Sequence, residues 1–160
     1  MRAVLKFGSA STLVLLAACA APMQVPEGFS RLRGGDGFVA RAADDGVLRL
    51  RKVPDPTEGS NAAFWLQALR TDFVGQRGYV ETGTGEVADA DGVTGHWIEC
   101  TANVRGEKVG YLAAVWARPA GAVLFGKGQS QVQVVEFAAR EPVYSARIAA
   151  VKKSLSTVRD

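Results

Sequence analysis

His96 and Cys100 are the two side chains whose types could carry out nucleophilic catalysis. The sequence has one histidine, and Cys100 is one of two cysteines. A thiol attacks as the thiolate, which a neighbouring imidazole can generate by accepting its proton. The two residues stand four positions apart in an expected strand, about 13 Å along it at ~3.3 Å per residue, which is too far for a direct hydrogen bond. We expect Cys100 to pack as a small apolar side chain and His96 to lie near the end of the sheet, and we keep a thiol-dependent hydrolase using both as an alternative.

Metal and nucleotide chemistry find little support in the sequence. The pair His96 and Cys100 offers too few ligands for a zinc site. Gly121 to Lys127 matches the first part of a phosphate-binding loop, yet Gly128 stands where a hydroxyl residue is needed, and a strand rather than a helix is predicted to follow. The sequence therefore predicts no catalytic residues of a known type, no metal, no nucleotide and no other cofactor.

The other cysteine, Cys19, ends the run Leu16-Ala17-Ala18-Cys19, which follows two basic residues and an apolar stretch. This segment resembles the signal peptides of bacterial lipoproteins. The resemblance implies that residues 1–18 are removed and that Cys19 receives a diacylglyceryl group and an acyl chain such as palmitate. The apolar stretch is too short for a transmembrane helix. Because Ala20 and Ala21 follow the cysteine, the pattern is similar to that of lipoproteins on the periplasmic face of the outer membrane, anchored in the lipid bilayer.

Removal of the signal peptide changes the charge of the chain. The full sequence of 160 residues has a net charge of +3, and two basic residues, Arg2 and Lys6, lie within residues 1–18. The mature chain would carry +1, and basic residues interleaved with aromatics do not cluster in it, so we expect no nucleic-acid binding. The remaining length suits one domain. We expect residues 19–35 to be a lipidated tether, because they are rich in proline and glycine, and residues 36–160 to form a single domain.

Alternation and helical periodicity predict an α+β domain in which an antiparallel sheet of about six strands is packed by two main helices. Strands are expected over residues 38–42, 47–53, 79–87, 94–105, 108–118 and 131–139, with a possible short strand over 122–125. Helices are expected over residues 62–74, capped by Ser60 or Asn61, and over 142–157. The strand over 131–139 is apolar on both sides, which indicates a central place in the sheet.

Two tryptophans mark the hairpin over residues 94–118. A two-residue turn at Gly106-Glu107 would place Trp97 directly opposite Trp116. If no element covers that face, the two rings would form an exposed partner surface. We favour the covered alternative, because Leu112 and Ala114 share the face and are usually buried.

The apolar stretches Gly110–Val115 and Val134–Phe137, followed by Ile148 and Lys153-Ser154-Leu155, resemble the PsbP-like fold, which includes DcrB-like lipoproteins. The resemblance implies an α/β/α sandwich and a binding or assembly module. We therefore expect a non-enzymatic envelope lipoprotein with a possible envelope protein partner. A carrier that holds a small apolar ligand between helix and sheet is a further alternative.

Overall fold

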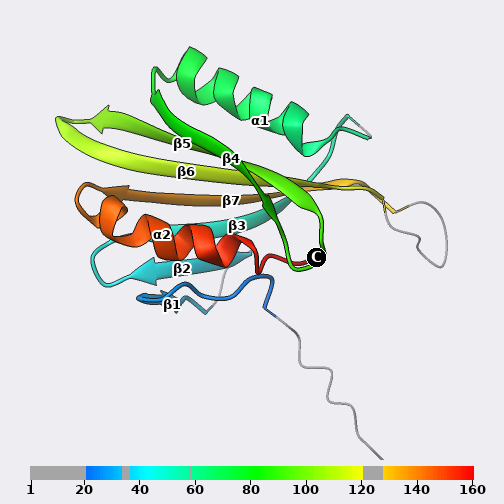
Figure 1. The fold of residues 1–160 in the computed structure, drawn as a ribbon, viewed down its shortest axis with the longest axis horizontal. Helices are drawn as coiled ribbons and strands as arrows, with labels where there is room; N and C mark the ends of the chain where they lie inside the picture. The colour runs from blue at the N-terminus through cyan, green and yellow to red at the C-terminus, as the bar shows by residue number, and fades with distance from the viewer. Residues whose placement is uncertain (1–20, 34–36, 58, 121–127) are drawn as a thin grey trace, which may run out of the picture.

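The computed structural model describes residues 21–33, 37–57, 59–120 and 128–160. Its strands are β1 (Phe29–Arg31), β2 (Phe38–Ala42), β3 (Val47–Pro54), β4 (Val80–Ala88), β5 (Thr94–Val104), β6 (Glu107–Arg118) and β7 (Gln131–Arg140). Its helices are α1 (Ala62–Arg70), which continues into the π-helix η1 (Thr71–Gln76), and α2 (Val143–Leu155). The expected fold class, α+β with an antiparallel sheet and two helices, is confirmed (Figure 1).

The seven strands form one antiparallel sheet in the order β1-β2-β3-β7-β6-β5-β4. The last strand of the chain, β7, lies in the middle of this order, as its two apolar sides predict. At one edge, β4 has a register shift between Glu81 and Gly83. The expected number of strands was about six, and the additional strand is β1.

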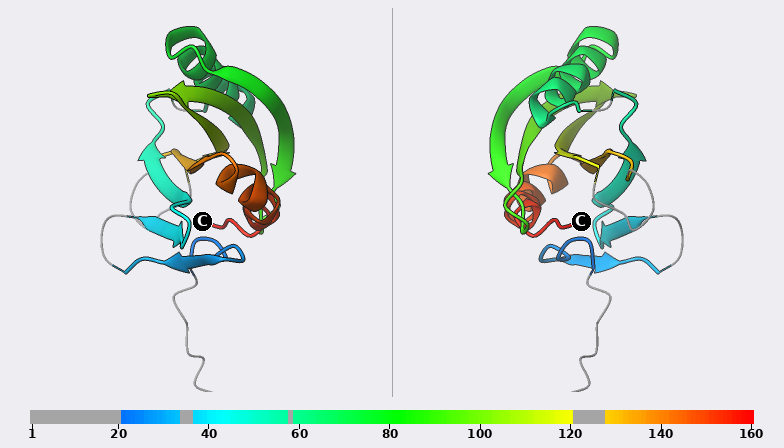
Figure 2. Two further views of the ribbon diagram at one scale, coloured as in Figure 1. Left: turned by 90° about the vertical axis from the view of Figure 1, so that its left-hand side faces the viewer. Right: turned by 90° about the vertical axis from the view of Figure 1, so that its right-hand side faces the viewer.

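The two helices lie on opposite faces of the sheet. Along β6, Leu112, Ala114 and Trp116 join the core cluster that contains α2 residues such as Val151, whereas Ala113 joins the cluster with Phe73 of η1. Because alternate strand residues point to opposite faces, α1 and α2 must cover different sides. Figure 2 shows the sheet curving around α2, with α1 on the outside. We call the α2 side the concave face and the α1 side the convex face.

The main core lies on the concave face. Rows of directly paired residues cross the sheet there, and one row runs Trp97, Ala114, Val135, Leu50 and Phe38. All of these except Trp97 are 3% exposed or less. Burial of apolar area stabilises a fold by ~25 cal/mol per Å², and this row is one part of the larger buried cluster on the concave face.

Part of the segment that was expected to be a tether packs against the folded body. Met23 is fully buried in the main core, and the backbone carbonyl of Pro22 accepts a hydrogen bond from Arg159 N at 3.0 Å. Phe29 in β1 packs edge-on against Phe137 with ring centres 5.8 Å apart. The prolines and glycines of this segment predict irregular backbone, but irregular backbone can still bury apolar side chains.

The turn between β5 and β6 also differs from the expectation. Arg105 and Gly106 both have positive φ, 54° and 84°, which is the pattern of a type I′ hairpin turn. The turn therefore comes one residue earlier than Gly106-Glu107, and Trp97 lies opposite Ala114 instead of Trp116. Each residue's partner moves by two positions, so every side chain stays on its expected face.

The helix boundaries follow from local signals. Asn61 caps α1, since its side-chain oxygen accepts a hydrogen bond from Phe64 N at 2.8 Å. The expected helix over 62–74 is correct in position, but its last part is the π-helix η1. In the described ranges, the structure contains no helix that is both long and apolar enough to cross a membrane.

Candidate binding surface on the convex face

The predicted cysteine and histidine do not form a catalytic pair. Cys100 is 1% exposed and packs with Phe73, Ile98 and Ala113 under α1 and η1. Burial, together with the nearby Glu81 carboxylate, raises the pKa of the Cys100 thiol to about 11. A thiol with such a raised pKa is protonated at neutral pH and is a poor nucleophile. The buried position was expected for Cys100, and it argues against the thiol-dependent hydrolase.

His96 lies on the same convex face, four residues before Cys100 and near the start of β5. The Nδ1 atom of His96 lies 3.9 Å from the Oε1 atom of Glu86, a residue of the neighbouring strand β4. The Glu86 side chain is 69% exposed. At this distance and exposure, the pair contributes little and does not orient the imidazole toward Cys100.

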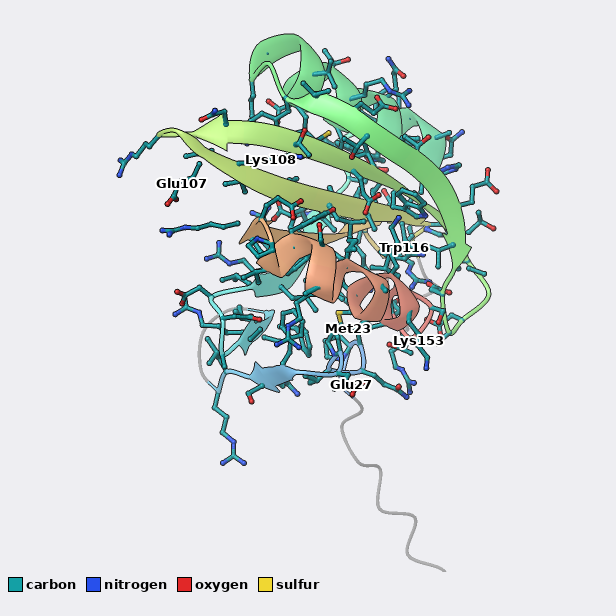
Figure 3. The ribbon with its side chains drawn as sticks, turned by 60° about the vertical axis from the view of Figure 1, so that its left-hand side comes forward. Met23, Glu27, Glu107, Lys108, Trp116 and Lys153 are labelled. Atoms are coloured by element: carbon teal, nitrogen blue, oxygen red, sulfur yellow. The ribbon has the colours of Figure 1, made fainter. Side chains whose placement is uncertain are left out.

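The two tryptophans lie on the concave face and are covered. Trp116 is fully buried in the main core. Trp97 is partly buried, and the Nζ atom of Lys152 in α2 lies 3.7 Å from the centre of its ring while also pairing with Glu99 at 3.0 Å. Figure 3 labels Trp116 at the side of the sheet on which α2 lies. The two rings therefore form no shared exposed surface, because α2 packs over the face that carries them.

Some sequence predictions fall on residues that the structure does not describe. Cys19 lies outside the described residues, and so do the glycine-rich run Gly121–Lys127 and the possible strand over 122–125. Lipidation of Cys19 therefore stays a prediction from the sequence.

An uncovered region of the convex face is a surface that the sequence analysis did not single out. Helix α1 contacts β5 and β6, and the β2, β3 and β7 half of this face carries no helix in the described part of the chain. Side chains of β2, β3 and β7 that alternate with the concave core point to this side. We call it the arginine face, and its residues are Arg41, Val47, Arg49, Arg51, Val134, Glu136 and Ala138.

Glu136 is the central acidic residue of the arginine face. Its carboxylate accepts a hydrogen bond from the Tyr111 hydroxyl of β6 and one from Arg51 of β3, the latter at 2.6 Å. Burial and the hydrogen bond to Glu136 raise the pKa of Tyr111 well above its ordinary value. The Glu136 carboxylate is thus bound by two side chains, Tyr111 and Arg51. The charges of this face that have no such partner are those of the other residues.

The remaining charges of this face are basic. Arg41 and Arg49 are exposed, and neither has an ion-pair partner among the described residues. Arg49 is the direct cross-strand neighbour of Glu136, and Arg41 is that of Val47. Clusters of like charge with apolar residues between them are suited to an oppositely charged partner surface.

A small groove borders the arginine face where α1 meets the sheet. Its volume is about 240 Å³, and its lining includes Trp65 and Leu69 of α1, Phe73 of η1, and Val132 and Val134 of β7. Ligand pockets for small molecules usually measure about 300–1,000 Å³. The groove is therefore too small for the expected apolar cargo between helix and sheet, and it better suits a single side chain of a partner.

Part of the arginine face can be recognised in the sequence of β3. In Val47–Val53, Leu48 and Leu50 alternate with Arg49 and Arg51, which is the period of a strand with one buried and one open face. The extent of α1 over the sheet has no such local signal. Only the three-dimensional structure shows that the open side of β3 is not covered by a helix.

By class, the molecule is an α+β protein with an open antiparallel sheet between two helices. A solved structure with a similar fold is that of LpqN, involved in cell envelope biogenesis of Mycobacterium tuberculosis, with a TM-score of 0.62. The similarity covers 84% of this chain and 79% of the LpqN chain, at 14% sequence identity. At this identity the likeness concerns the fold. No family model and no curated protein matches the sequence, so the PsbP-like relationship stays a prediction.

Proposed function

We propose that the protein is an envelope lipoprotein, anchored through acylated Cys19 at the periplasmic face of the outer membrane, that acts as a non-enzymatic binding or assembly module. The observation that carries the binding role is the arginine face, on which Arg41 and Arg49 are exposed and Arg51 lines the groove next to α1. Its partner is an acidic surface of another envelope component. The fold of LpqN, a protein of cell envelope biogenesis, supports an envelope role.

The binding role is tested by photo-crosslinking in intact cells. A photoreactive amino acid placed at Val47, an uncharged residue of the arginine face directly opposite Arg41, should give one discrete adduct with an envelope protein. The adduct should be lost when Arg41→Glu is added, because the reversed charge repels an acidic partner. The matched control places the same photoreactive residue at Lys108, which is exposed in β6 at the hairpin away from the arginine face. Equal adducts from both positions, or none from position 47, would contradict the proposed surface.

The anchor is tested separately by metabolic labelling with a fatty-acid analogue. The wild-type chain should incorporate the label, and the Cys19→Ala variant should not, because the thiol that accepts the diacylglyceryl group is absent. Equal labelling of both chains would show that the lipid is attached elsewhere or not at all.

A further inference from the structure

We propose that one end of the folded domain rests directly on the surface of the phospholipid bilayer, held there by the shortness of the connection to Cys19. This end consists of residues 22–33, the neighbouring Lys52 and Lys153, and residues 157–160; we call it the anchor end. The proposal rests on the lipid anchor proposed above and adds the orientation of the domain relative to the membrane. Figure 3 labels Met23, Glu27 and Lys153 at this end.

The length of chain between Cys19 and the folded body limits how far the domain can lie from the bilayer. Two residues, Ala20 and Ala21, separate Cys19 from Pro22. An extended chain spans at most about 3.6 Å per residue, so Pro22 lies within about 11 Å of Cys19 along the backbone. An acylated cysteine lies at the level of the lipid headgroups, and each headgroup layer is about 5–8 Å thick. A domain fixed at Pro22 therefore has no free tether that would carry it away from the bilayer.

Pro22 is part of the folded body and is not the end of a loose segment. Its carbonyl accepts the hydrogen bond from Arg159 N, and Gln24 N donates to the Thr157 hydroxyl at 2.9 Å. Met23, between them, is fully buried. Lengthening the connection would require these two hydrogen bonds and the Met23 packing to be lost together.

The composition of the anchor end suits a lipid surface. Val25 and Leu32 are 38% and 47% exposed, which is high for large apolar side chains. Basic residues outnumber acidic ones at this end: the former are Arg31, Arg33, Lys52, Lys153 and Arg159, and the latter are Glu27 and Asp160, which pairs with Lys52. Pro22, Arg31 and Lys52 line a common cavity, which places the two cations beside the entry of the chain. Exposed basic residues are attracted to the anionic lipids of a bilayer surface.

The experiment measures how close the anchor end is to the lipid headgroups. Val25→Cys introduces an exposed thiol at this end, and Lys108→Cys introduces a matched one on the β5–β6 hairpin. Native Cys100 is 1% exposed and should not react with the label. The full-length lipidated protein is labelled with a small fluorophore and placed in vesicles of phosphatidylethanolamine and phosphatidylglycerol that contain a headgroup spin label. The label at position 25 should be quenched several-fold more strongly than the label at position 108.

Equal and weak quenching at both positions, in protein that carries the lipid, would overturn the proposed orientation. Failure of the anchor gives a different result, because an unacylated Cys19 would take up the fluorophore in the chain without an introduced cysteine, and the protein would not remain with the vesicles. The two failures are therefore distinguishable in the same preparation.

Discussion

Cys100 shows how a reactive residue type becomes a packing residue. Its direct neighbours in the sheet are Glu81 on β4 and Tyr111 on β6. Phe73 of η1 packs over it, and the Phe73 ring in turn meets the Tyr111 ring edge-on with centres 5.0 Å apart. These contacts exclude water from the sulfur, and an apolar environment disfavours the thiolate.

The raised pKa of Cys100 predicts a loss of stability at high pH. In the folded chain the thiol has a pKa of about 11, whereas its ordinary value is 9.0. Below pH 9 the thiol is neutral in both states. Between pH 9 and 11 only the unfolded chain ionises, so the free energy of unfolding falls over that range. Urea unfolding of Cys19→Ala and of Cys19→Ala with Cys100→Ala should show a stability difference that shrinks from pH 8 to pH 11.

The comparison isolates Cys100, since the two chains share every tyrosine that titrates at high pH. A difference in stability that is the same at pH 8 and pH 11 would mean that the Cys100 thiol ionises in the folded chain about as easily as in the unfolded one.

Tryptophan and glycine are paired across the strands on the concave face. A Cβ atom added to Gly95 would lie 2.4 Å from Trp116 Nε1, and one added to Gly85 would lie 2.5 Å from the Trp97 ring. The bulky rings thus lie over positions without a side chain. Gly85 is the direct partner of Trp97 in the register. This arrangement explains why two glycines and two tryptophans occur in neighbouring strands that otherwise favour β-branched residues.

At the scale of elements, the turn between β4 and β5 is joined to the centre of the sheet by a buried ion pair. The guanidinium of Arg118 in β6 contacts the Asp89 carboxylate, with side-chain exposures of 7% and 0%. Arg118 also donates to Gln133 of β7, whose amide donates to the Arg159 carbonyl at 3.0 Å. Four segments of the chain, the β4–β5 turn, β6, β7 and the residues after α2, are therefore connected by one set of hydrogen bonds.

Breaking this pair should be far more costly than breaking an exposed one. Arg118→Met leaves the Asp89 carboxylate buried without its cation, and we expect a loss of about 3–5 kcal/mol in the free energy of unfolding. Arg140→Met is the matched control, because Arg140 and Glu107 are 71% and 53% exposed, and its loss should be about 0–1 kcal/mol. Urea unfolding measures both, and similar losses for the two variants would contradict the structural role of Arg118.

The elements themselves were largely predictable from sequence. Short apolar runs predicted β2, β3 and β7, the pattern of alternate apolar residues predicted β5 and β6, and the apolar periodicity of residues 62–74 predicted α1. The β5–β6 turn was misplaced because Arg105, at positive φ, is a residue type that rarely occupies that conformation. Strand β1 has only three residues, too few for any periodic pattern. The arginine face depends on how far α1 extends over the sheet, which is a tertiary property without a local sequence signal.

For the whole molecule, the segment before β2 is part of the fold and closes one end of it. Figure 2 shows this segment beside β2, next to the end of the chain that follows α2. Val158 and Met23 are both fully buried in the main core. The first and last described segments thus complete the same region of the core.

A chain that begins at residue 36 should therefore be less stable than one that begins at residue 21. The shorter chain lacks Met23, Phe29 and β1, and loss of a buried side chain such as Met23 alone costs about 2–5 kcal/mol. We expect a lower midpoint of thermal unfolding and faster proteolysis near Val158. The chain from residue 21 is the matched control and should unfold like the mature protein. Equal midpoints for the two chains would show that residues 21–35 are a tether after all.

The hydrogen bond between Arg159 and Pro22 has a practical consequence for reporter design. A fluorescent protein or epitope fused after Asp160 would be crowded against the segment that begins at Pro22, where it would disturb the hydrogen bond and the packing of the buried Met23. The Arg105-Gly106 turn is exposed, joins two long strands and is remote from Pro22. Exposed loop tips of this kind tolerate insertions best, so a short tag placed there reports on the protein with the least disturbance.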